Sequence, residues 1–82
     1  MNILLRTKDV QNALGISRST VYERMKDGLL PQPVKTSVRA NRWPKDEISK
    51  LIAAKIAGVD DEVIRALVTR LLEQRQIVKV EV

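Results

Sequence analysis

The stretch GISRSTVYERMKDGLL, residues 15–30, decides the fold that this chain is expected to adopt. Ser17 places a hydroxyl where it can accept a backbone N–H of the following turn, which is the usual role of a residue that begins a helix. Gly28 can take the left-handed conformation that ends a helix. The sequence therefore predicts a short helix over about residues 18–27.

A second short helix is predicted just before this one. Thr7 can cap its start, and Val10, Ala13 and Leu14 form an apolar face at i, i+3 and i+4 spacing. Gly15 follows directly and closes the helix. Two short helices joined by a turn of about three or four residues that contains glycine are typical of a helix-turn-helix.

The outward side of the helix over residues 18–27 is polar. Val21 and Met25 lie together on its inward side when the sequence is projected at about 100° per residue. The remaining groups can hydrogen-bond base edges and phosphates in a major groove, or they can form an ordinary solvated surface. The candidate DNA-binding residues of this helix are Arg18, Ser19, Tyr22, Glu23 and Lys26.

A basic β-hairpin is predicted after this helix. Pro31 and Pro33 disfavour helix and bias the residues before them toward extended backbone. Residues 34–36 and 39–43 are therefore predicted as two short strands joined by a polar, basic turn. Such a hairpin is a wing, which can cross the DNA backbone or enter the minor groove. The candidate DNA-binding residues of the wing are Lys35, Arg39, Asn41 and Arg42.

A third helix is predicted to begin near Pro44 and to end at Gly58. Trp43, just before it, is expected to pack the wing onto the helices rather than to stack on a base, because the chain has no phenylalanine and needs a large ring in its core. The apolar stripe of this helix is Ile48, Leu51, Ile52 and Ile56.

A fourth helix, capped by Asp60, is predicted over the C-terminal part of the chain. Its apolar residues span roughly 180°, wider than the ~100° that a helix needs to dock on one core. Self-association through a homodimer and a purely intramolecular core both explain this width. The candidate dimerisation residues are Ile64, Leu67, Val68, Leu71 and Leu72, with Val63 beside them. The tail from Ile77 to Val82 alternates with strand period, which leaves an added strand, a pairing arm or a frayed end open.

The composition limits the classes of function. Residues 1–45 hold nine basic and three acidic side chains, a balance of +6, whereas residues 46–82 hold six basic and seven acidic ones, a balance of −1. An excess of positive charge in one half favours a polyanion-binding face there. The chain has no cysteine and no histidine, so we expect neither an enzyme nor a metal or cofactor site. No signal peptide or membrane span is recognisable, and a cytoplasmic protein is expected.

The run LLRTKDVQNALGISRSTVYERMKDGLLPQPVK, followed by NRWPKDEISKLI, resembles the AlpA family of small phage and prophage regulators. The matching landmarks are Leu5, the SRSTVY opening, GLLPQPVK before the wing, the wing exit at Arg42 and Trp43, and the DEI segment. The resemblance covers about residues 4–54. The wing tip KTSVRAN lacks a glycine-rich turn, and residues 59–82 form an extension outside the motif.

The resemblance implies a mostly α winged helix-turn-helix, related to the MerR DNA-binding domain and to phage excisionases, over residues 1–58, with a C-terminal helical extension over residues 59–82. It implies a non-enzymatic protein that binds double-stranded DNA. Such a protein acts as a transcription regulator, as an excisionase that works with an integrase, or as both. An alternative is a small module that inhibits a regulatory protein through its apolar C-terminal helix. Carried over by the resemblance, the recognition-helix role falls on Arg18, Ser19, Thr20, Tyr22, Glu23 and Lys26, and the wing role on Lys35, Arg39 and Arg42.

Overall fold

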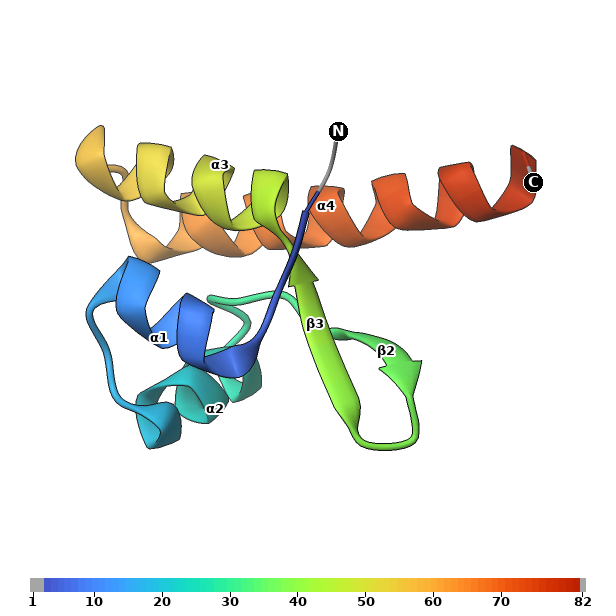
Figure 1. Cartoon of the computed structure of the whole chain (residues 1–82). Coiled ribbons are helices and arrows are strands. Elements are labelled where there is room, and N and C mark those ends of the chain that lie inside the picture. Colours follow the sequence, from blue (N-terminus) through green and yellow to red (C-terminus); the bar gives the residue numbers. More distant parts are fainter. Residues whose placement is uncertain (1–2, 82) are drawn as a thin grey trace.

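The computed structural model describes the backbone of residues 3–81 and the side chains of residues 3–75. Helices α1 (Thr7–Leu14) and α2 (Arg18–Lys26) form the helix-turn-helix, and helices α3 (Lys45–Ile56) and α4 (Asp61–Glu81) lie across it as a second layer (Figure 1). Strands β2 (Val34–Ser37) and β3 (Ala40–Pro44) form the wing, which projects from one side of this body. The fold is therefore the predicted winged helix-turn-helix with a C-terminal helix.

The helix ends follow from local sequence, with one correction. Ser17 caps α2, and Gly15 and Gly28 take the left-handed conformation with φ of 67° and 79°. Thr7, however, is the first residue of α1 and does not cap it; Arg6 holds the N-cap position. The carboxylate of Asp9 accepts the backbone N–H of Arg6 at 3.0 Å, so this helix begins without a hydroxyl cap.

A short strand that the sequence pattern did not predict completes the sheet. Strand β1 (Leu4–Leu5) pairs antiparallel with β3, with Leu4 opposite Pro44 and Leu5 opposite Trp43, which gives the strand order β1-β3-β2. The wing pairs Val34 with Arg42 and contains a bulge between Lys35 and Ser37. Because β3 is held on both sides, the base of the wing is fixed to the N-terminus of the domain.

Trp43 joins the wing to the helices, as expected. Its side chain is fully buried, and its indole N–H donates to the backbone carbonyl of Pro31 at 2.9 Å, which satisfies its polar atom. One hydrophobic cluster surrounds it and draws on all four helices. Its buried members are Val10, Val21, Leu30, Trp43, Ile48, Leu51, Ile64, Val68 and Leu71. Ile56, predicted to belong to the core stripe of α3, is instead 82 % exposed at the end of that helix.

Two arginines of α4 fasten it to the segment between α2 and the wing. Arg65 donates from Nε to the carbonyl of Asp27 at 2.9 Å, and Arg75 donates from Nη1 to the carbonyl of Gln32 at 2.8 Å. Arg75 also forms a two-point ion pair with the buried carboxylate of Glu47 in α3.

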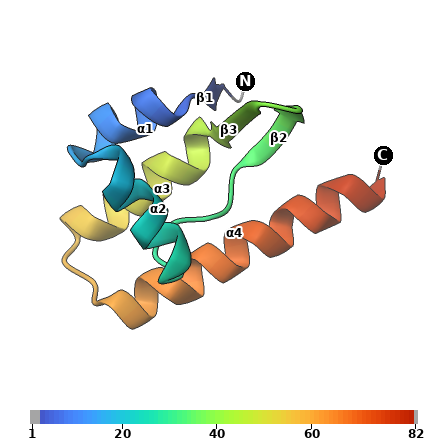
Figure 2. The same cartoon turned by 90° about the horizontal axis from the view of Figure 1, so that it is seen from below.

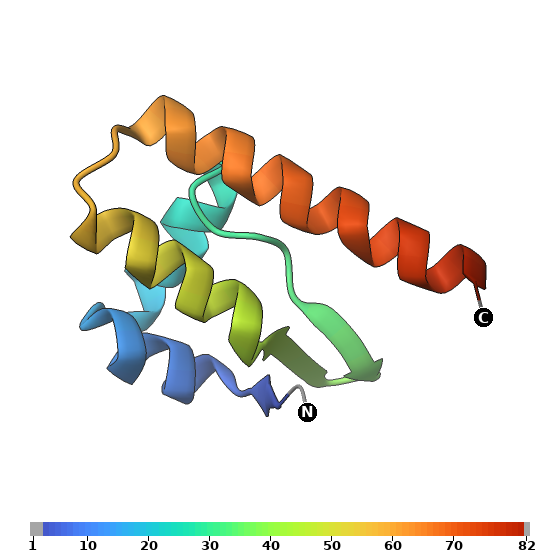
Figure 3. The ribbon, with the colours of Figure 1, turned by 90° about the horizontal axis from the view of Figure 1, so that it is seen from above.

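Seen from above, α4 runs beside α3 and continues past the body of the domain (Figure 3). The backbone is helical through Glu81, which excludes the added strand among the three possibilities that the sequence left open for the tail. The side chains of the tail lie outside the described residues.

Candidate nucleic-acid interface

The start of α2 is held by a network of hydroxyl groups. The Ser17 Oγ accepts the backbone N–H of Thr20 at 3.3 Å, and it lies 2.9 Å from the Thr20 Oγ1 and 3.2 Å from the Ser19 Oγ. These contacts fix the first turn, which is the part of a recognition helix that enters a major groove. They also occupy the hydroxyl of Thr20, which lies on the side of the cap.

Arg18 and Tyr22 are paired on the outward side of α2. The Arg18 guanidinium carbon lies 5.8 Å from the centroid of the Tyr22 ring, within the range of a cation–π contact. At an exposed site such a contact contributes about 0.5–1 kcal/mol. The ring therefore restricts the arginine to a smaller set of directions before any ligand is present, which lowers the entropy lost on binding.

The wing supplies basic side chains on the same side of the molecule. Arg42 donates from Nη1 to the carbonyl of Asn41 at 2.9 Å, which holds its guanidinium beside the backbone of the hairpin. The Thr36 hydroxyl donates across the turn to the carbonyl of Ala40 at 3.4 Å. Viewed from below, the hairpin stands out beside the paired helices α1 and α2 (Figure 2). The wing and the helix-turn-helix can thus face one ligand together.

A shallow hollow brings these elements together, and we call it the basic hollow. It lies where the first two turns of α1, the first two turns of α2 and the wing converge, and none of its lining residues is acidic. Its lining residues are Arg6, Thr7, Lys8, Gln11, Arg18, Tyr22, Arg39, Asn41 and Arg42. Five of them are cationic, which suits a polyanion such as a DNA backbone.

The structure divides the predicted site residues into two groups. Those that line the basic hollow are Arg18, Tyr22, Arg39, Asn41 and Arg42. Those that lie outside it are Ser19, Thr20, Glu23, Lys26 and Lys35. Glu23 and Lys26 are exposed farther along α2, and Lys35 is exposed on β2. DNA contacts by the residues of both groups stay a prediction.

Four residues that line the hollow were missed by the sequence analysis: Arg6, Thr7, Lys8 and Gln11. They belong to the N-terminal end of α1, which the sequence presents as a supporting helix. The only signal was the pair of cations at Arg6 and Lys8, which added to the charge of the first half without indicating a location. Their placement beside Arg18 depends on the packing of α1 against α2.

The apolar stripe of α4 is largely used inside the domain. Ile64, Val68 and Leu71 are 2 %, 5 % and 2 % exposed, so these three candidate dimerisation residues pack inside the domain. The reason is that α4 packs on α3 and on the segment after α2, which together offer a wider core than expected. Leu67 and Leu72 are partly buried beside this core, and Val63 is 50 % exposed. That part of the stripe joins two protomers stays a prediction, and these three residues are its more accessible members.

The model of the prophage CP4-57 regulatory protein (AlpA) family matches residues 3–56, which include the helix-turn-helix, the wing and α3. The chain belongs to the AlpA family. It is also 35 % identical over 54 residues to the uncharacterized protein ORF88 of Enterobacteria phage P4. That match covers 66 % of this chain and 61 % of the phage protein. No solved structure matches the chain.

The AlpA-family match covers residues 3–56 and ends before α4. The residues of the basic hollow lie between positions 6 and 42, so all of them fall inside the matched segment. In the described part of the chain, no group of three or more acidic, cysteine or histidine side chains is placed to hold a metal ion. No helix in that part is long and apolar enough to cross a membrane.

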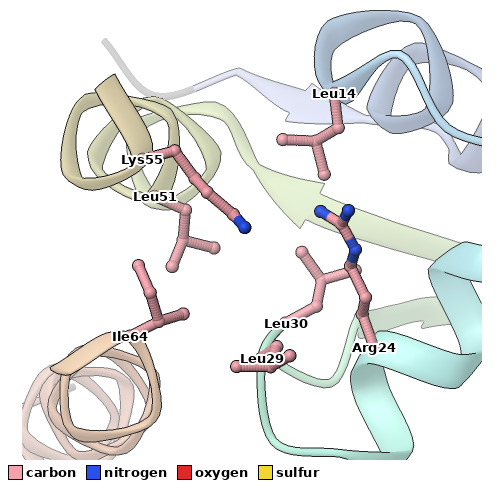
Figure 4. Close-up of a pocket in the computed structure, with 7 residues that line it drawn as sticks. All are labelled: Leu14, Arg24, Leu29, Leu30, Leu51, Lys55 and Ile64. Atoms are coloured by element: carbon pink, nitrogen blue, oxygen red, sulfur yellow. The ribbon is translucent and has the colours of Figure 1, made fainter. Parts of the chain in front are cut away.

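A second cavity lies inside the helical body, between the two helix layers. Leucines and Ile64 line it, and the side chains of Arg24 and Lys55 reach over it with their charged ends turned toward each other (Figure 4). Its volume is about 20 Å³, room for roughly one water, whereas ligand pockets usually measure about 300–1,000 Å³. This cavity is therefore a packing gap rather than a small-molecule site.

Proposed function

We propose that this AlpA-family chain is a sequence-specific DNA-binding protein of a phage or an integrated mobile element, acting as a transcription regulator, as an excisionase, or as both. The observation that carries the proposal is the basic hollow, where five cations from two helix starts and the wing converge and no lining residue is acidic. Membership of a family described as regulatory supports it.

The geometry supports a division of labour between the two basic elements. Helix α2 enters the major groove with Arg18 and Tyr22 leading, because its N-terminal turn is exposed and fixed by the Ser17 cap. The wing, through Lys35, Arg39 and Arg42, lies along the neighbouring backbone. Phosphate contacts set the register of the protein, and α2 reads the base edges.

The partners in this proposal are double-stranded DNA, a second copy of the chain on DNA, and an integrase in the excisionase case. The chain acts by binding and not by catalysis. The alternative, an inhibitor that docks through an apolar C-terminal helix, loses support because Ile64, Val68 and Leu71 are already in the core. The salt dependence of binding discriminates between the two functions. The affinity for DNA falls steeply with rising salt because binding releases counterions, whereas the affinity of apolar docking changes little.

The test is a footprint of the protein on the mobile element that encodes it. Protection at a promoter favours transcriptional control, and protection at an arm of an attachment site favours excision. The protected duplex then serves as the cognate site for binding measurements. Absence of protection anywhere on the element, with only weak and uniform binding, would contradict sequence-specific recognition.

A further inference from the structure

The tip of the wing carries an apolar side chain. Val38 is 94 % exposed, more than any other large hydrophobic residue of the described chain. A single exposed valine elsewhere on a protein surface is ordinary and indicates no function. This one lies in the two-residue turn between β2 and β3, next to Arg39, on a hairpin whose outward residues are otherwise polar or basic.

The tip is also held in place. The Thr36 hydroxyl bonds the carbonyl of Ala40 across the turn, and the bulge between Lys35 and Ser37 adds twist to the end of the hairpin. At the other end, β3 is pinned by β1 and by the buried Trp43. Valine itself is stiff because its branched Cβ limits its rotamers. The tip is therefore prepared to make an apolar contact at small cost in entropy.

The positive charge beside the tip favours a polyanion as the partner. Arg39 adjoins Val38 in the turn, and Arg39 lines the basic hollow that the proposed function assigns to DNA. On a duplex, the apolar surface next to phosphates is the sugar walls and base edges of the minor groove. Proteins that bind there often insert apolar side chains.

Resting on the proposed function, we propose that Val38 enters the minor groove and makes the wing selective for base pairs that lack the guanine N2 amine. A·T pairs show only the adenine N3 and thymine O2 acceptors in that groove, whereas guanine adds an amine that projects from its floor. A valine methyl would occupy the space of that amine and would leave the amine without a hydrogen-bond acceptor.

The test compares poly(dI-dC) with poly(dG-dC). Inosine presents the same major-groove edge as guanine but lacks the N2 amine, so the two duplexes differ in the minor groove. The wild-type protein should bind poly(dI-dC) about fivefold or more tightly than poly(dG-dC), the lower end of the effect of one mismatched base pair. Val38→Ser should bring this ratio near unity while leaving the salt slope unchanged, because no charge is removed.

Ile56→Ser is the matched control, since Ile56 is 82 % exposed at the end of α3, and it should keep the wild-type ratio. Equal wild-type affinity for the two polymers, or a Val38→Ser variant that keeps the ratio, would overturn this inference and leave salt-dependent DNA binding intact. Failure of the wild type to bind any duplex would remove the proposed function as well. Sedimentation without DNA adds a third arm: loss of self-association in Val38→Ser would assign the tip to a contact between copies instead.

Discussion

Removing a cation of the basic hollow should flatten the salt dependence of DNA binding by a countable step. Each phosphate contact contributes about −0.9 to the slope of log K against log salt. If all five cations of the hollow meet phosphates, they contribute about −4.5, so raising salt from 50 to 200 mM weakens binding about 500-fold. Arg6→Ala should reduce this loss to about 150-fold, and Arg6→Ala with Lys8→Ala to about 40-fold.

Fluorescence anisotropy with a labelled 20-base-pair duplex of random sequence, titrated at five salt concentrations, measures the slope. Arg42→Ala provides the comparison within the wing, and Arg70→Ala, an exposed cation on α4, is the matched control that should leave the slope unchanged. Arg6 contributes only its backbone N–H to the cap of α1, so Arg6→Ala should fold normally. A wild-type slope in both Arg6→Ala and Lys8→Ala, with a reduced slope in Arg42→Ala, would show that the start of α1 does not contact DNA.

Arg18→Ala should weaken binding to the footprinted site by about 1–3 kcal/mol and to random DNA much less, as loss of a base contact does; equal losses on the two duplexes would make Arg18 a phosphate contact. Leu71→Ala should lower the free energy of unfolding by about 2–5 kcal/mol, because Leu71 is 2 % exposed, whereas Val63→Ala at 50 % exposure should change it by less than about 0.5 kcal/mol in urea titrations. Similar effects of the two changes would remove α4 from the core. Arg75→Met should lower the free energy of unfolding by about 2–3 kcal/mol in the same assay, less than for a fully buried pair because 23 % of the arginine side chain is exposed. Adding Glu47→Met should restore much of this lost stability. No gain from the second change would mean that the stranded carboxylate is not the source of the cost.

Local sequence was enough to place most of the fold. The hydroxyl of Ser17 and the glycines at 15 and 28 set the ends of the helix-turn-helix through interactions within one turn, which are visible in the sequence. Trp43 was placed in the core by the shortage of other large rings. Strand β1 was missed because two residues, Leu4 and Leu5, are too few to show a period.

The candidate site was predicted only in part, because half of it depends on tertiary packing. Arg18 and the wing arginines could be predicted from their positions in the helix-turn-helix and the wing. Arg6 and Lys8 reach the basic hollow only because α1 packs against α2 and β1 pairs with β3. The width of the apolar stripe of α4 could not be interpreted from the sequence for the same reason. A helix that contacts α3 on one side and the loop after α2 on the other buries a wider arc than one neighbour requires.

The shared core has a practical consequence for dissecting the chain. The family match ends at residue 56, which makes the end of α3 an inviting place to truncate. Leu30 and Leu51 line the same cavity as Ile64, and Ile64, Val68 and Leu71 complete the cluster around them, so a fragment ending there would turn this apolar face toward water. Tolerance of truncation follows burial and not motif boundaries. Loss of DNA binding on deleting residues 57–82 would therefore report the collapse of the fold, and it would say nothing about pairing between copies.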